Sequence, residues 1–307
     1  MSQSQLNQTD FEPIEYEAAE AEKISGQSTS YWKDAWRRFR KNKLALASII
    51  VIILLGLMAA FGTVLSGQNY FDNDLISANK PVSGGHWFGT DNLGRDIFAR
   101  TWYGARISLF IGLSAAFIDL VIGVIWGSVS GYVGGKVDEY MMRIADILTG
   151  VPYLLVVVLL TVIMPRGLWS IIIAMTITGW INMARIVRGE VYRLKTEEYV
   201  MAAKSLGAKA TRIMWKHLIP NMLGPIIVTL TLTIPNAIFT EAFLSFLGLG
   251  VPQPQASWGT MTSDALDSLR YYPYQLLFPA FFICLTMLAF NVIGDGLRDA
   301  LDPKDRS

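Results

Sequence analysis

Six long apolar stretches, separated by shorter polar segments, dominate the pattern of hydrophobic and polar positions in this chain. The hydrocarbon core of a bilayer is about 30 Å thick, and a helix needs about 20 mostly apolar residues to cross it. Each stretch reaches or nearly reaches that length. The six lie at residues 44–66, 107–130, 139–164, 168–188, 218–240 and 276–297. The pattern therefore predicts an all-α, polytopic membrane protein with six transmembrane helices.

The distribution of basic residues predicts the orientation of these helices. If the amino terminus is inside, residues 189–217 and the carboxyl terminus also face the cytoplasm, whereas residues 67–106 and 241–275 face outside. Only six of the 26 lysine and arginine residues then fall outside or at the outer boundary: Lys80, Arg95, Arg100, Arg106, Arg166 and Arg270. Cytoplasmic loops carry an excess of basic residues, which favours this orientation.

The chain divides accordingly. We expect a cytoplasmic tail at 1–43, a first helix at 44–66, an extracytoplasmic loop at 67–106, a helical core at 107–297 that includes the cytoplasmic segment 189–217, and a cytoplasmic tail at 298–307. Residues 1–30 contain six acidic residues and no apolar core, so they are expected to form a solvated tail rather than a signal peptide.

The segment YWKDAWRRFRKNK at 31–43 places Trp32, Trp36 and Phe39 at helical spacing among six basic residues. This pattern is typical of an interfacial helix on anionic lipid. The alternative is a plain basic flank to the first transmembrane helix, and both interpretations stay open.

Composition agrees with a membrane protein and excludes several other classes. Of 307 residues, 52% are hydrophobic and 17% are charged, and the net charge of +1 provides no field that would attract nucleic acid. The single cysteine, Cys284, excludes an internal disulfide. His86 and His217 are far apart in the sequence, so we expect no metal site.

The motifs of nucleotide hydrolysis and nucleophilic catalysis are absent from the sequence. The nearest approach to a phosphate-binding loop, GGKV at 134–137, lacks the leading glycine and the hydroxyl residue, and Gly-x-Ser-x-Gly does not occur. We therefore predict that the chain is not an enzyme and binds no cofactor.

Small, polar and helix-breaking residues interrupt the apolar stretches. Glycines in the spans predict close helix packing, and prolines predict interrupted helices. These residues are Gly56, Gly112, Gly123, Gly127, Gly131, Pro152, Pro225 and Pro235. Asp119 lies in the middle of the second stretch. An acid at membrane depth indicates a functional pathway by default, but for Asp119 a structural hydrogen bond between helices is the preferred of the two interpretations.

Residues 197–217 are predicted to form one amphipathic cytoplasmic helix, capped by Thr196 and ended by Pro220. Its largely apolar face consists of Tyr199, Ala203, Leu206, Ala210, Ile213 and His217. Small residues at Ala202, Ala203 and Gly207 permit close approach to a groove on another protein. A helix that lies flat on the membrane is the alternative.

This segment resembles the loop that permease subunits of binding-protein-dependent ABC importers present to their ATPases. The family pattern is Glu-Ala-Ala, three residues, Gly, nine residues, then Ile-x-Leu-Pro. The sequence matches at Ala202, Ala203, Gly207 and Pro220, and it departs from the pattern with Met201, His217 and Ile219. The resemblance implies ATPase coupling through Tyr199, Ala202, Ala203, Leu206, Gly207, Ile213 and Pro220.

Three further segments are similar to the oligopeptide and dipeptide permease group, and with residues 31–45 they most resemble its C-type subunit. They are HWFGTDNLGRDIFARTWYGARISLFIG at 86–112, EAFLSFLGLGVPQPQASWGTM at 241–261 and NVIGDGLRDALDPKDR at 291–306. The resemblance implies a type I ABC importer permease fold in a prokaryotic cell membrane. It also implies a heterodimer with a B-type permease subunit, two cytoplasmic ATPase subunits that bind ATP and Mg, and an extracytoplasmic peptide-binding protein.

The same segments have a physical interpretation. Glycine and Asp/Asn turns in GTDNLGRD predict a rigid outer cap in which Arg95 pairs with Asp96, with substrate contact as the alternative. The glycines and prolines after Pro235 predict a broken helix, which is either a wall of the translocation pathway or simple packing. Candidates for the pathway are Asp119, Glu241, Phe243, Phe246 and Trp258.

The carboxyl-terminal run GDGLRDALDPKDR predicts a solvated helix end with internal ion pairs among Asp295, Arg298, Asp299 and Asp302. Three functional alternatives stay open at this point. They are an ion-coupled secondary transporter that uses Asp119, a non-transporting membrane anchor or receptor, and an ABC permease whose cargo is a dipeptide or nickel.

Overall fold

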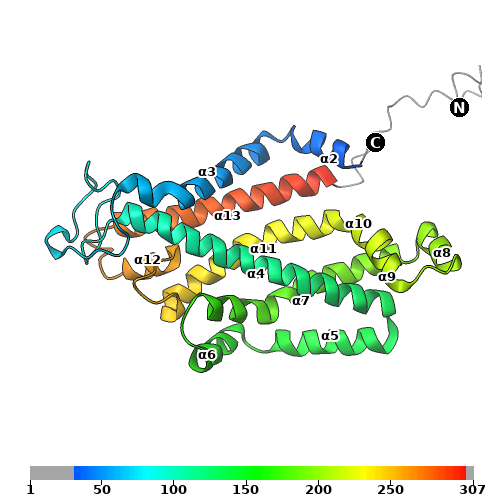
Figure 1. Ribbon diagram of the computed structural model, residues 1–307. Helices are drawn as coiled ribbons and strands as arrows, with labels where there is room; N and C mark the ends of the chain where they lie inside the picture. Colours follow the sequence, from blue (N-terminus) through cyan, green and yellow to red (C-terminus); the bar gives the residue numbers. More distant parts are fainter. Residues whose placement is uncertain (1–30, 302–307) are drawn as a thin grey trace, which may run out of the picture.

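The computed structural model describes residues 31–301, and this part of the chain is a helical bundle without β-strands (Figure 1). The long helices are α2 (Tyr31–Phe39), α3 (Lys43–Ser66), α4 (Ile97–Val133), α5 (Gly135–Gly150), α6 (Tyr153–Ile163), α7 (Leu168–Leu194), α11 (Leu223–Leu244) and α13 (Tyr274–Leu301). The short elements are η2 (Leu75–Ser77), α8 (Glu198–Ser205), α9 (Ala210–Ile213), the π-helical turn η3 (Met214–Leu218), α10 (Ile219–Asn221), the π-helical turn η4 (Ser245–Leu249) and α12 (Trp258–Asp264). The predictions for residues 1–30 and for Asp302 lie outside the described residues.

Within residues 31–301, five helices are long and apolar enough to cross a membrane: α3, α4, α7, α11 with its continuation η4, and α13. A sixth crossing is possible only if the bent pair of α5 and α6 is one span. The single helix predicted at 139–164 is therefore wrong, because the two helices differ in direction by 81°. Pro152 explains the break, since a proline disfavours a helical conformation in the preceding residue and Val151 is extended.

Helix α4 begins ten residues earlier than the hydrophobic pattern predicts. The Asp96 side chain caps it by accepting a hydrogen bond from the Ala99 N–H at 2.7 Å. Arg106 donates to the carbonyl oxygen of Ala60 in α3 at 2.8 Å. A charged residue therefore lies within the helix without ending it, because a neighbouring helix supplies its acceptors.

Glycines on α4 allow its backbone to approach α7 closely. A side-chain carbon added at Gly123, Gly127 or Gly131 would collide with Met183, the Ala184 carbonyl oxygen or the Arg188 carbonyl oxygen, respectively. These glycines recur every four residues and therefore share one helix face. The predicted close packing is confirmed here and at Gly112, which faces Ile238, whereas Gly56 on α3 has open space.

Two of the three predicted proline breaks are wrong. Pro225 and Pro235 both lie inside the continuous helix α11. Pro225 falls in the first turn of α11, where the backbone N–H that a proline lacks would have no helical partner. The neighbouring helices of the bundle support α11 around Pro235, which is buried.

The bundle has two structurally different ends (Figure 1). The α8 end holds α2, α8, α9, α10 and the last turns of α13, and the α12 end holds residues 67–96 and α12. Phe39 and Ala300 pack together with Ala45, which fixes α2 on the end of α13. Of the segment 31–43, for which a helix was one of two interpretations, residues Tyr31–Phe39 form a helix, with Trp32 and Trp36 exposed. Its contact with lipid stays a prediction.

Candidate functional site

The segment predicted as one helix at 197–217 is instead two helical pieces joined by a turn. Helix α8 ends at Ser205, and Gly207 has φ +80°, a left-handed conformation that favours glycine. The Ala208 N–H donates to the Ala203 carbonyl and the Gly207 N–H to the Lys204 carbonyl, both at 3.0 Å, which is the hydrogen-bond pattern of a Schellman motif. The prediction of an uninterrupted helix is therefore wrong.

Both predicted ends of this segment also differ. The Thr196 hydroxyl donates to the Arg193 carbonyl at the end of α7, so Thr196 does not cap α8. Pro220 lies in the first turn of α10, where its missing N–H costs little, and the helical path continues to Asn221. The break before α11 falls at Met222, whose backbone leaves the helical region.

The predicted apolar face of this segment divides into a buried part and an exposed part. Ile213 is buried with Val200 and Leu218 against Val187 and Val191 of α7. These contacts hold α8 and α9 rigidly on the bundle.

Four other apolar side chains of the segment are exposed. Leu206 is 89% exposed, and Tyr199, Met201 and Trp215 are between 40% and 64% exposed. We name these four residues the α8 surface. Ala202 and Gly207 are exposed beside them, Ala203 is half-buried, and Pro220 is exposed. The small side chains leave this backbone open to close approach.

Asp119 lies in α4 and faces a cavity between α4, α6, α7 and α11. The cavity has a volume of about 270 Å³. Asp119 is 5% exposed, and its Oδ1 has no hydrogen-bond partner among the described residues. The preferred interpretation of a structural hydrogen bond is therefore wrong for this oxygen. Gly179 of α7 leaves room for the carboxylate, because a side-chain carbon there would collide with Oδ2.

Polar side chains from three other helices complete this cavity. The Tyr153 hydroxyl is buried and, like Asp119 Oδ1, has no hydrogen-bond partner within the described part of the chain. The other polar side chains in the lining are Thr178, Asn182, Thr233, Asn236 and Thr240. A second cavity of about 410 Å³ shares Tyr153, Thr178 and Asn182 and extends to Arg185, which pairs with Asp146 at 2.7 Å. The two cavities adjoin along α7.

Most of this lining is not predicted from the sequence, although one signal is present. Thr233, Asn236 and Thr240 recur at steps of three and four in an otherwise apolar helix. They therefore form a polar stripe on one face of α11. Such a stripe in a membrane helix faces protein or water rather than lipid.

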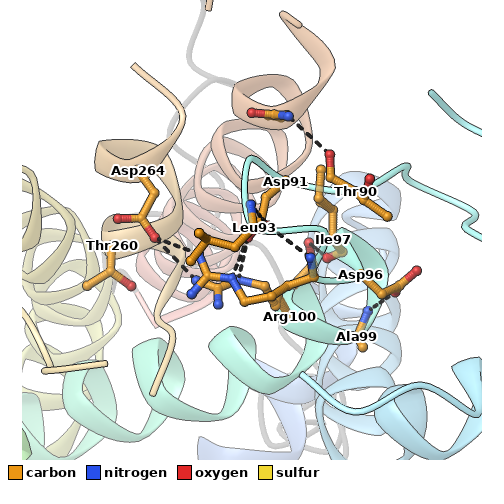
Figure 2. A network of polar contacts seen from close by, with 12 residues as sticks. Thr90, Asp91, Leu93, Asp96, Ile97, Ala99, Arg100, Thr260 and Asp264 are labelled. Atoms are coloured by element: carbon orange, nitrogen blue, oxygen red, sulfur yellow. Dashed lines mark hydrogen bonds and ion pairs between the residues drawn. The ribbon is translucent and has the colours of Figure 1, made fainter. Parts of the chain in front are cut away.

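A buried ionic network connects the start of α4 with α12 (Figure 2). Asp91 accepts from Arg95 Nε at 2.6 Å and lies 3.6 Å from Arg100 Nε. Both arginines reach Asp264 of α12, at 3.5 and 3.3 Å. Burial raises the pKa of Asp264, and the two arginines oppose this shift.

The predicted pair of Arg95 with Asp96 is wrong. One oxygen of Asp96 caps α4, and the other lies 2.9 Å from His86 Nδ1. Arg95 turns instead to Asp91 and Asp264. The rigid cap predicted for GTDNLGRD is confirmed as a hydrogen-bonded turn fixed to the bundle.

Two of the pathway candidates are fully buried. Glu241 accepts from the hydroxyls of Ser108 and Ser245 at 2.9 and 2.7 Å. The Trp258 indole donates to the Thr101 carbonyl at 3.0 Å. Both side chains connect elements of the bundle, and neither lines the cavity beside Asp119.

The other two candidates, Phe243 and Phe246, are 40% and 44% exposed. The predicted broken helix is confirmed by η4, inside which Gly248 has φ +77°. The chain that follows η4 packs against protein, because an added side-chain carbon at Gly259 would collide with Ala242 and one at Gly104 would lie 3.1 Å from Ser257. Packing therefore accounts for the irregular backbone of this stretch in the present conformation.

Replacing Arg100 with methionine is expected to destabilise the protein by about 3 kcal/mol, because Asp91 and Asp264 lose one of their two counter-charges and are left to share Arg95. Arg100 is 2% exposed. The measurement is the thermal unfolding midpoint of the purified protein in detergent. Arg270→Met is the matched control, since Arg270 is exposed between α12 and α13. Equal midpoints for the two variants would contradict a structural role of the network.

Comparison with known proteins identifies the class of this bundle. Residues 120–307 match the family described as "Binding-protein-dependent transport system inner membrane component". Residues 30–81 match the N-terminal TM domain of oligopeptide transport permease C. The chain belongs to the family of binding-protein-dependent transport system inner membrane components.

The chain is similar over nearly its whole length to curated permeases. It is 64% identical to the oligopeptide transport system permease protein OppC of Bacillus subtilis, covering 96% of this chain and 97% of that protein. It is 58% identical to the dipeptide transport system permease protein DppC of Bacillus subtilis, covering 94% and 90%. Identity to OppC of Escherichia coli strain K12 is 44%, covering 93% and 95%.

A solved structure of the MetNI methionine ABC transporter, in an inward-facing conformation, has a similar fold. The TM-score is 0.55 at 18% identity, and the match covers 65% of this chain and 94% of that chain. The predicted fold of a type I ABC importer permease is confirmed. The predicted transport subunit, as opposed to an enzyme, is confirmed by the family. As a component of such a system, the chain works in the membrane with a substrate-binding protein and ATPase subunits.

Proposed function

We propose that this chain forms half of the translocation pathway of an oligopeptide importer and that its ATPase partner docks on the α8 surface. The observation that carries the proposal is the division of the 197–217 segment. Ile213 and Val200 fix the segment to α7 through buried contacts, whereas Leu206 and Tyr199 are exposed. An exposed apolar surface on a rigid support is suited to transmit a movement of its partner into the bundle.

The names of the similar permeases support a proposal for the cargo. Proteins that are 64% and 44% identical to this chain carry the name oligopeptide permease, and one that is 58% identical carries the name dipeptide permease. We infer oligopeptides as the cargo, with dipeptides as the second candidate. A binding protein on the α12 side would deliver the peptide.

The remaining subunits complete this proposal. A B-type permease subunit would pair with this chain, and two cytoplasmic ATPase subunits would bind ATP and Mg. The α8 end would face the cytoplasm, as the basic residues of α2 and of the α8–α10 segment favour. Closure of the ATPases would then reorient the helices around the cavities beside α7, in an alternating-access cycle.

Reconstitution into lipid vesicles tests this function. We expect uptake of labelled tetra-alanine only when the permease pair, the ATPases, the binding protein and internal ATP are all present. Asp119 supports a second candidate, an ion-coupled secondary transporter, because it is a buried acid at membrane depth. Uptake by this chain alone, driven by a proton gradient without ATP, would establish that candidate and contradict the importer.

A further inference from the structure

We propose that the cavity beside Asp119 binds the protonated amino terminus of the peptide in transit, with the Asp119 carboxylate as its counter-charge. The inference rests on the proposed function and names the part of the cargo that this chain recognises. It concerns one end of the peptide, which every oligopeptide shares whatever its side chains. A site of this kind would serve cargo of varied sequence.

The first argument is the unpaired state of a buried acid. Asp119 is 95% buried, because its exposed fraction is 5%. Its Oδ1 lacks a hydrogen-bond partner, and within residues 31–301 no lysine or arginine forms an ion pair with it. Buried charges in proteins are normally paired. We therefore infer that the Asp119 carboxylate pairs with a cation that comes from outside the chain.

The second argument is the chemistry of the surrounding wall. An ammonium group donates three hydrogen bonds and accepts none. The wall around Asp119 offers oxygen acceptors from Tyr153, Asn182, Asn236 and Thr233, and it contains no basic side chain. The Tyr153 oxygen is itself unpartnered. One acid among neutral acceptors matches the single charge of an α-amino group.

The third argument is size and position. A cavity of about 270 Å³ exceeds the share of about 30 Å³ that one water occupies in the liquid, so it can hold an amino group and the first residue of a peptide. The adjoining cavity of about 410 Å³ continues along α7. The rest of an extended peptide could occupy this second cavity, which shares Tyr153, Thr178 and Asn182 with the proposed amino-terminal site.

The first test measures uptake by the complete importer in vesicles, using tetra-alanine with a free or an acetylated amino terminus. Uptake is normalised to the occupancy of the binding protein by each peptide. For Asp119→Asn we expect uptake of the free-amine peptide to fall about tenfold or more, with little change for the acetylated peptide. Asp119→Glu should recover part of the loss. Asp267→Asn is the matched control, because Asp267 is exposed between α12 and α13.

The outcomes separate this inference from the proposed function. If wild-type uptake depends on ATP and Asp119→Asn transports both peptides like the wild type, the inference is wrong and the importer stands. If Asp119→Asn prevents assembly with the partner permease, Asp119 pairs with a cation of that subunit, which also overturns the inference. If the wild type shows no ATP-driven uptake, the proposed function itself fails.

A second measurement avoids mutation of the site. The wild-type complex in detergent is treated with dicyclohexylcarbodiimide, and modification of Asp119 is measured by mass spectrometry. Free-amine tetra-alanine should protect Asp119 severalfold, whereas the acetylated peptide should not. Equal modification with both peptides would overturn the proposal even if every Asp119 variant failed to fold.

Discussion

Replacing Gly127 with leucine is expected to destabilise the bundle strongly and to lower the yield of folded protein. A side-chain carbon at this position would overlap the Ala184 carbonyl oxygen of α7, and that backbone atom cannot rotate away. Gly123 and Gly131 hold α4 equally close on either side, so the two helices cannot separate locally. The expected cost is about 3 kcal/mol, a large part of the stability of a typical domain.

The measurement for this prediction is the yield of monodisperse protein in detergent, together with its unfolding midpoint. Gly56→Leu is the matched control, because Gly56 lies in the membrane helix α3 and an added carbon there meets nothing within 4 Å. The control should fold with wild-type yield. Wild-type yield and midpoint for Gly127→Leu would show that α4 and α7 are not in close backbone contact.

Replacing Leu206 with aspartate is expected to abolish stable association with the ATPase subunits while leaving the bundle intact. Leu206 is 89% exposed, so its loss removes almost no contact inside this chain. In the proposed complex the carboxylate would be buried without a partner, which is costly. We expect affinity for the ATPase to fall about a hundredfold or more, measured by pull-down in detergent and by ATPase activity of the complex.

Leu75→Asp is the matched control for this variant. Leu75 is 72% exposed in η2, at the α12 end of the bundle. This control should bind the ATPase like the wild type. Equal binding by Leu206→Asp and Leu75→Asp would exclude the α8 surface as the docking site.

The hydrophobic pattern predicts five of the passes through the bundle, but it does not predict the bend in the apolar stretch at 139–164. Length and apolarity predict the ends of α3, α7, α11 and α13 to within a few residues, because a helix that crosses a membrane needs a long apolar stretch. The bend between α5 and α6 depends on Pro152. The mean hydropathy of a long apolar stretch hardly changes with one residue, so it does not reveal this bend. The early start of α4 depends on acceptors in α3, which are 46 residues away in sequence.

Helical periodicity also cannot distinguish a face buried in its own chain from one left for a partner. Ile213 and Leu206 fit the same apolar stripe, yet one is 1% exposed and the other 89% exposed. The glycine at 207 fits the stripe as well, although its left-handed conformation ends α8. The sequence therefore predicts which segment is important but not which residues are available for docking.

The polar sites illustrate a similar limit. Asp119 is visible in the sequence because it interrupts an apolar stretch, but its cavity needs side chains from α6, α7 and α11. Because Asp96 is the sequence neighbour of Arg95, the sequence predicts an ion pair between them. In the structure Arg95 instead pairs with Asp91 and with Asp264, which is 169 residues away. Partners at such separations are set by the fold rather than by local sequence.

Photo-crosslinking from position 206 in the complete importer tests whether the ATPase subunit docks on the α8 surface. A photoreactive amino acid would replace Leu206 in the assembled complex, within native membranes, and adducts would be identified by mass spectrometry. If docking occurs there, we expect adducts with the ATPase subunit whose yield changes when ATP is bound. Adducts with phospholipid alone, in a complex that still transports peptide, would contradict it.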